Sequence, residues 1–162
     1  MALLTSYYVP GLHIEERAID VPLDWEGNTP GGAIKGETIR LFCRVVCAPE
    51  HVHDDLPLLV FLQGGPGGQC PRPLSPSSDG WIQEAIKHFR VVLPDQRGVG
   101  RSSRIDASTM KRMLDDGVSV ERQAWYLKRF LADSIIRDFE HLRLTEFDCL
   151  LYTSPSPRDG LL

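Results

Sequence analysis

Two glycine-rich turns, each following an apolar run, are the residues of this chain best suited to chemistry. The first turn follows LPLLVFLQ and reads GGPGG (residues 64–68), and the second follows FRVVLP and reads DQRGVGRSS (residues 95–103). Because glycine has no side chain, the main-chain N–H groups of the first turn can approach a ligand oxygen closely, and Pro66 stiffens the turn. We therefore predict that the first turn forms an oxyanion hole, a pair of N–H donors that stabilises negative charge on a substrate oxygen.

The order of these two turns resembles the proline iminopeptidase family of α/β hydrolases, in which a strand-GGPG turn precedes a strand-DQRGxGxS turn. Further blocks of sequence agree with that family: VPLDW (21–25), CPRP (70–73), GWIQEAIKHF (80–89) and FLADSIIRD (130–138). The resemblance runs from about residue 10 to residue 146. One position differs, since Gln63 stands where the family usually has histidine, but this change leaves the oxyanion backbone untouched.

The resemblance implies a serine aminopeptidase whose substrate is a small peptide with an N-terminal proline. A serine would attack the carbonyl after that proline, helped by histidine and aspartate, through a covalent acyl-enzyme. The backbone N–H of Gly65 is the expected oxyanion donor, with that of Gly64 as the fallback, and the second donor would follow the serine. Two alternatives stay open: another α/β hydrolase, such as an esterase or epoxide hydrolase, or a non-catalytic protein of this fold.

The nucleophile itself is missing from the 162 residues, which contain no G-x-S-x-G elbow. The family order places this elbow after the helical stretch that ends near Arg143, with the acid and the base later still. All five histidines precede that point, so none can be the family's base. We therefore expect residues 1–148 to be an incomplete α/β-hydrolase domain, truncated before the nucleophile elbow and inert as it stands.

The composition changes abruptly at the end of the chain, where CLLYTSPSPRDGLL (residues 149–162) is rich in serine and proline. The string LLYTSPSPRD resembles the translation of a transposase adapter used in sequencing libraries. We therefore interpret residues 149–162 as a non-native tail, the alternative being a natural Ser/Pro linker.

Composition excludes several other classes of function. The net charge is -4 with a pI near 5.7, and no run of Lys or Arg predicts a nucleic-acid surface. The longest apolar run is far shorter than the roughly 20 residues that span a bilayer, so no membrane contact is expected. The first residues do not read as a secretion signal, so a cytoplasmic location is expected. No metal, disulfide or cofactor is expected, because the cysteines show no CxxC or His-paired spacing and no GxxxxGK[ST] follows the first turn.

The elements that must position the turns follow from the apolar patterns. Residues 13–23 and 38–48 predict an antiparallel pair of strands, and residues 56–62, 80–89 and 89–94 predict a parallel strand-helix-strand unit that brings both turns to one crevice. With no further parallel strand before the tail, residues 56–62 are expected at an open sheet edge. A helical stripe from Ser119 to Leu142 should cover the sheet, with Asp133 capping a second segment if the helix breaks.

Three polar residues of the second turn could be mistaken for catalytic groups. We expect Arg97 to form a structural ion pair that braces the loop. Ser102 and Ser103 lack an elbow, so loop capping explains them better than a nucleophile's role. The cysteines 43, 47 and 70 are expected to fill the core.

Overall fold

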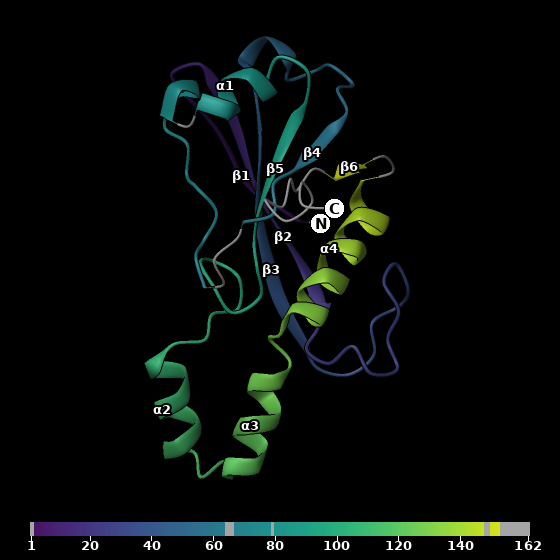
Figure 1. The fold of residues 1–162 in the computed structure, drawn as a ribbon, viewed down its shortest axis with the longest axis vertical. Helices are drawn as coiled ribbons and strands as arrows, with labels where there is room; N and C mark the ends of the chain where they lie inside the picture. Colours follow the sequence, from purple (N-terminus) through teal and green to yellow (C-terminus); the bar gives the residue numbers. More distant parts are fainter. Residues whose placement is uncertain (1, 64–66, 79, 148–149, 153–162) are drawn as a thin grey trace, which may run out of the picture.

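The computed structural model describes residues 2–63, 67–78 and 80–147, together with the backbone of residues 150–152. Its framework is a six-stranded sheet in the order β1-β2-β3-β5-β4-β6 (Figure 1). The strands β2 (Leu12–Pro22) and β3 (Thr38–Cys47) pair antiparallel over ten residue pairs, which confirms the predicted opening. A further antiparallel strand, β1 (Ala2–Val9), precedes them at the sheet edge. Its residues are mostly exposed, so no buried face marked it in the sequence.

The predicted parallel unit follows. The strand β4 (Leu58–Val60) pairs parallel with β5 (Arg90–Asp95), and the short helix α1 (Gly80–Ala85) forms the crossover between them. Two 3₁₀ turns, η1 (Pro49–His51) and η2 (Pro76–Ser78), lie in the connections. Because β5 also pairs antiparallel with β3, the two halves form one mixed sheet. The predicted α/β fold class is confirmed.

The expected open edge beside β4 is wrong. The strand β6 (Leu150–Tyr152) pairs parallel with β4 over three residue pairs, so β4 lies inside the sheet. β6 comes from the segment interpreted as a non-native tail. Its residues LLY are apolar and aromatic, and such residues favour strands whatever their origin.

Three helices follow β5 in the described part of the chain. The predicted single stripe is two helices, α3 (Val120–Lys128) and α4 (Ala132–Glu146), and another helix, α2 (Ala107–Asp115), precedes them. Asp106 caps α2 and Ser119 caps α3 by accepting main-chain N–H bonds, but α4 begins after Leu131 without a side-chain cap. The expected cap at Asp133 is therefore wrong, because that residue already lies inside the first turn of α4.

These three helices differ in how they contact the sheet. Figure 1 shows α4 lying along it, while α2 and α3 form a hairpin that projects beyond its end. α4 buries Phe139 and Leu142, whereas α2 and α3 bury no residue in the structure. The expectation that the whole stripe packs on the sheet is therefore right for α4 and partly right for α3, whose half-buried Trp125 and Tyr126 pack against the same core cluster while Leu127 is exposed. None of these helices, over the residues described, is both long and apolar enough to cross a membrane.

The core lies on both faces of the sheet and fixes the strand that carries the second turn. On one face Ile82 and Ile86 pack with β2, β3 and β5, and on the other α4 packs against β2 and β3. Val91, Val92 and Leu93 of β5 are fully buried between these layers. Burying each such side chain stabilises the fold by about 1.5–3 kcal/mol. The carboxyl end of β5 is thus a rigid point from which the turn at Asp95 emerges.

Candidate active-site crevice

Both glycine-rich turns open into one cavity, as expected for loops at the carboxyl ends of neighbouring parallel strands. The cavity has a volume of about 400 Å³. It is lined by Gly67, Gln69, Gly98, Val99, Gly100, Arg104 and Ile105. A cavity of this size can hold a small ligand, and its glycine walls present main chain rather than side chains.

The two predicted oxyanion donors, Gly64 and Gly65, lie outside the residues that the structure describes. The nearest described residues are Gln63 before them and Gly67 after them. Gln63 ends the segment after β4, and Gly67 lines the cavity with φ of 106°, a conformation that residues with side chains rarely adopt. The assignment of Gly65 and Gly64 as oxyanion donors therefore stays a prediction.

Asp95 joins the two turns. Its carboxylate is almost fully buried, and its Oδ1 accepts a hydrogen bond of 2.8 Å from the N–H of Cys70, just after the first turn. Its Oδ2 accepts one of 2.9 Å from the N–H of Arg101, in the second turn. Such charge-assisted bonds are about twice as strong as neutral ones.

Gln96 makes a second link between the turns, which the sequence did not indicate. Its Nε2 donates a 2.8 Å hydrogen bond to the carbonyl of Gln63, the residue directly before GGPGG. Gln96 belongs to the DQRG motif, but an uncharged side chain does not indicate its partner, so the bond to Gln63 is visible only in the structure. Nearby, the Cys70 thiol donates to the carbonyl of Pro94 at 2.8 Å. Residues on both sides of the first turn are therefore bonded to the end of β5.

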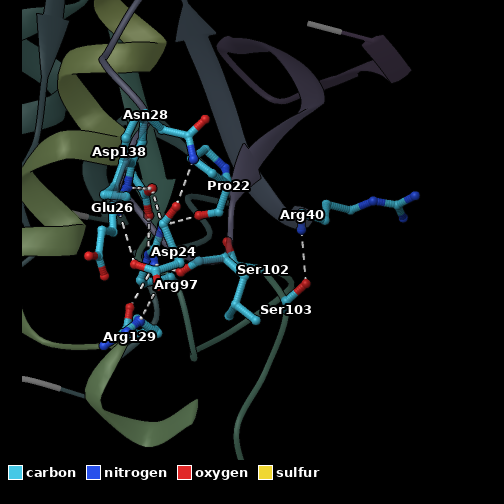
Figure 2. A network of polar contacts seen from close by, with 12 residues as sticks. Pro22, Asp24, Glu26, Asn28, Arg40, Arg97, Ser102, Ser103, Arg129 and Asp138 are labelled. Atoms are coloured by element: carbon cyan, nitrogen blue, oxygen red, sulfur yellow. Dashed lines mark hydrogen bonds and ion pairs between the residues drawn. The ribbon is translucent and has the colours of Figure 1, made fainter. Parts of the chain in front are cut away.

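Arg97 forms the predicted ion pair, and its partner is Asp138 of α4. Its Nε and Nη2 donate to the two carboxylate oxygens at 2.6 and 2.5 Å, and Trp25 also donates to Asp138 at 3.0 Å. Figure 2 shows this network between the second turn and α4. The remaining N–H groups of Arg97 donate to the main-chain carbonyls of Pro22, Leu23 and Arg129. All five donors are used inside the protein, so Arg97 braces the loop and has none left for a ligand.

Ser102 and Ser103 are structural, as predicted. The Ser102 hydroxyl donates to the carbonyl of Asp95 at 2.6 Å and accepts from the N–H of Phe42 at 2.9 Å. The Ser103 hydroxyl accepts from the N–H of Arg40 at 2.9 Å (Figure 2). Both hydroxyls therefore hold the second turn against β3.

Among the residues that the structure describes, Ser6 lies next to a histidine. Ser6 Oγ lies 2.8 Å from His13 Nε2, but the atom facing His13 Nδ1 is Cys47 Sγ at 3.9 Å rather than a carboxylate. This pair lies on β1 and β2 and lacks the third group that orients a catalytic base. None of the five histidines belongs to the lining of the cavity between the turns, as far as the structure describes it.

Cys70 is predicted to be unreactive although it adjoins the crevice. It is buried, and burial is the main cause that raises the pKa of its thiol from 9.0 to about 12, with the Asp95 charge adding to the rise. Its thiolate fraction near pH 8 should therefore fall by roughly 10³-fold. In the folded chain, iodoacetamide should leave the Cys70 peptide unmodified over a time that fully labels it in urea, as measured by mass spectrometry. Equal labelling in both conditions would contradict this packing.

Comparisons with known proteins agree with the geometry of the two turns. A sequence profile for the alpha/beta hydrolase fold matches residues 57–142, which include both turns and α4 up to Leu142. The chain belongs to the α/β-hydrolase family. Within it, the chain is 42% identical over 137 residues to a proline iminopeptidase of Aeromonas sobria, a match covering 85% of this chain and 29% of that protein. It is 39% identical over 124 residues to a proline iminopeptidase of Aspergillus aculeatus, covering 74% of this chain and 26% of the relative.

These matches confirm the resemblance inferred from the GGPG and DQRG turns. The α/β-hydrolase chain spans less than a third of the length of the curated relatives it matches. In α/β hydrolases the reacting groups stand at the carboxyl edge of the parallel strands. The cavity beside β4 and β5 lies at that edge.

Proposed function

We propose that this sequence belongs to a serine aminopeptidase that releases N-terminal proline from peptides. The observation that carries the proposal is the cavity shared by the GGPGG and DQRGVG turns, in a chain 42% identical to a protein named proline iminopeptidase. The glycine walls leave room for a substrate carbonyl to approach main-chain N–H groups. The buried Asp95 and the half-buried Gln96 link the two turns beside that space, and the buried Arg97 fixes the second turn to α4.

In this proposal the 162 residues contribute one part of the mechanism: main-chain N–H groups that stabilise the negative charge on the substrate oxygen. In the proposed reaction a serine attacks the substrate carbonyl, and the N–H of Gly65, or of Gly64, donates to the oxygen that becomes negative. Losing one such donor lowers turnover by about 10² to 10³. Because the given chain contains no G-x-S-x-G, we propose that it has the charge-stabilising turn without the covalent route.

Two proteins test the proposal: the 162-residue chain, and a longer gene product that contains residues 1–148, which the proposal requires. The longer protein is expected to hydrolyse proline-naphthylamide faster than alanine-naphthylamide, and a serine-directed phosphonate should block it. The 162-residue chain should hydrolyse neither the amide nor simple esters.

Two results would contradict the proposal. Faster turnover by the longer protein of esters or epoxides than of proline-naphthylamide would indicate a different α/β hydrolase. Phosphonate-sensitive turnover by the 162-residue chain, surviving purification, would show that the chain carries a nucleophile of its own.

A further inference from the structure

We infer that Asp95 and Gln96 are positioning residues, which together set the place of the GGPGG turn and hence of the proposed oxyanion donors. The inference deepens the proposed function and rests on it for its catalytic part. Neither side chain is expected to touch the substrate. Each acts through the main chain at one end of the turn.

The strand before the turn holds it weakly. β4 ends at Val60, and its pairing with β5 extends one step further through the N–H of Phe61, which donates to the carbonyl of Val92 at 2.9 Å. Gln63 already lies outside any strand. Because the strand ladder does not hold Gln63, other contacts must fix the ends of a glycine-rich turn that is to act as a preorganised donor.

Those contacts come from two consecutive residues at the end of β5. The Gln96 side chain binds the carbonyl of Gln63 before the turn, and the Asp95 carboxylate binds the N–H of Cys70 after it, both at 2.8 Å. Gln63 and Cys70, on either side of the GGPGG turn, are therefore held by the last residue of β5 and the residue that follows it. Fixing both ends of a short loop removes much of its conformational freedom.

The same carboxylate also closes the second turn. Asp95 Oδ2 accepts from the N–H of Arg101, and the backbone of Gly100 passes so near that a Cβ there would lie 2.2 Å from Oδ2. The two walls of the cavity thus share one buried anion. Because a misplacement of about 1 Å at a reacting group can cost about 10²-fold in rate, this shared anchor matters for turnover more than for substrate binding.

The decisive variant is Gln96→Glu, which keeps the shape of the side chain but replaces the donor to Gln63 with an acceptor. The matched control is Gln123→Glu, because Gln123 also donates through Nε2 to a main-chain carbonyl at 2.8 Å, in this case that of Val118 near α3. Gln96→Leu removes the donor without adding charge and should give the same result as Gln96→Glu.

The first measurement needs no activity. In the ¹⁵N-labelled 162-residue chain, Gln96→Glu is expected to lower the ¹H–¹⁵N heteronuclear NOE of Gly67 and Gly68, while Gln123→Glu leaves both values unchanged. Unchanged values in Gln96→Glu and Gln96→Leu, or an equal fall in the control, would overturn the inference that Gln96 fixes the turn.

The second measurement uses the longer gene product. Gln96→Glu should lower kcat for proline-naphthylamide by about 10- to 100-fold with KM within twofold of the parent, whereas Gln123→Glu leaves both unchanged. A loosened turn with an unchanged kcat would overturn the catalytic part. If the parent itself shows no aminopeptidase activity, the proposed function fails, and the NOE values alone decide whether Gln96 positions the turn.

Discussion

Replacing Arg97 with methionine is expected to lower the free energy of unfolding by about 3–5 kcal/mol, the usual result of removing one partner of a buried ion pair. The side chains of Arg97 and Asp138 are both 0% exposed, so water cannot take the place of the lost guanidinium. The change also leaves the carbonyls of Pro22, Leu23 and Arg129 without these donors. Each buried acceptor left unsatisfied adds about 1–3 kcal/mol when the surroundings cannot relax.

The stability of the Arg97→Met variant should depend on pH through the titration of the Asp138 carboxyl. Burial raises the pKa of the Asp138 carboxyl, and the hydrogen bonds and charge of Arg97, with the Trp25 N–H, oppose that rise. Without Arg97 the pKa of the Asp138 carboxyl in the folded chain should rise further, while its pKa in the unfolded chain stays at about 3.9. The folded variant then binds a proton that the unfolded chain does not, so its stability increases as the pH falls. The free energy of unfolding that Arg97→Met loses relative to the parent chain should therefore be smaller near pH 5 than near pH 8.

Urea unfolding of the 162-residue chain, followed by tryptophan fluorescence, measures both effects. Arg122→Met is the control. The Arg122 side chain is 51% exposed, and its Nη2 lies 3.8 Å from Oε2 of Glu37. An exposed pair of this kind contributes about 0–1 kcal/mol. Similar losses in the two variants, or a deficit for Arg97→Met that does not change with pH, would contradict a buried and charged partner at Asp138.

The parts of the crevice that could be predicted from sequence are those that follow from local rules. The DQRG turn needs glycine where the chain takes positive φ, and Gly98 and Gly100 have φ of 87° and 57°. A strand-helix-strand crossover brings both turns to one edge of the sheet, and they share a cavity. An arginine in a buried loop requires a carboxylate, but the sequence could not indicate that Asp138, 41 residues away, supplies it.

Other features escaped prediction because distant residues decide them. The bond from Gln96 to Gln63 depends on the register between β4 and β5, which no sequence period specifies. The strand β1 has little burial and hence no alternating pattern to detect. The stripe from Ser119 continues across the break between α3 and α4, so its period alone could not place the boundary.

Replacing Gly100 with alanine should disturb both walls of the cavity at once. A Cβ at this position would lie 2.2 Å from Asp95 Oδ2 and 2.5 Å from Asp95 Cγ, so the carboxylate must move. Its movement would weaken the bonds to the N–H groups of Cys70 and Arg101, each worth about 1.5–3 kcal/mol as a hydrogen bond to a charged group. The positive φ of Gly100 adds about 1–2 kcal/mol of backbone strain for any residue with a Cβ.

The matched control for this change is Gly117→Ala, which isolates the cost of the carboxylate. Gly117 has a positive φ of 71° after α2, but a Cβ there would meet nothing within 4 Å. Urea unfolding should therefore show a loss of about 1–2 kcal/mol for Gly117→Ala and about 2–4 kcal/mol more for Gly100→Ala. Amide exchange at Cys70 should accelerate in Gly100→Ala alone, because only that change displaces its acceptor. Equal losses in the two variants, with Cys70 still protected, would mean that the Asp95 carboxylate does not hold the two turns together.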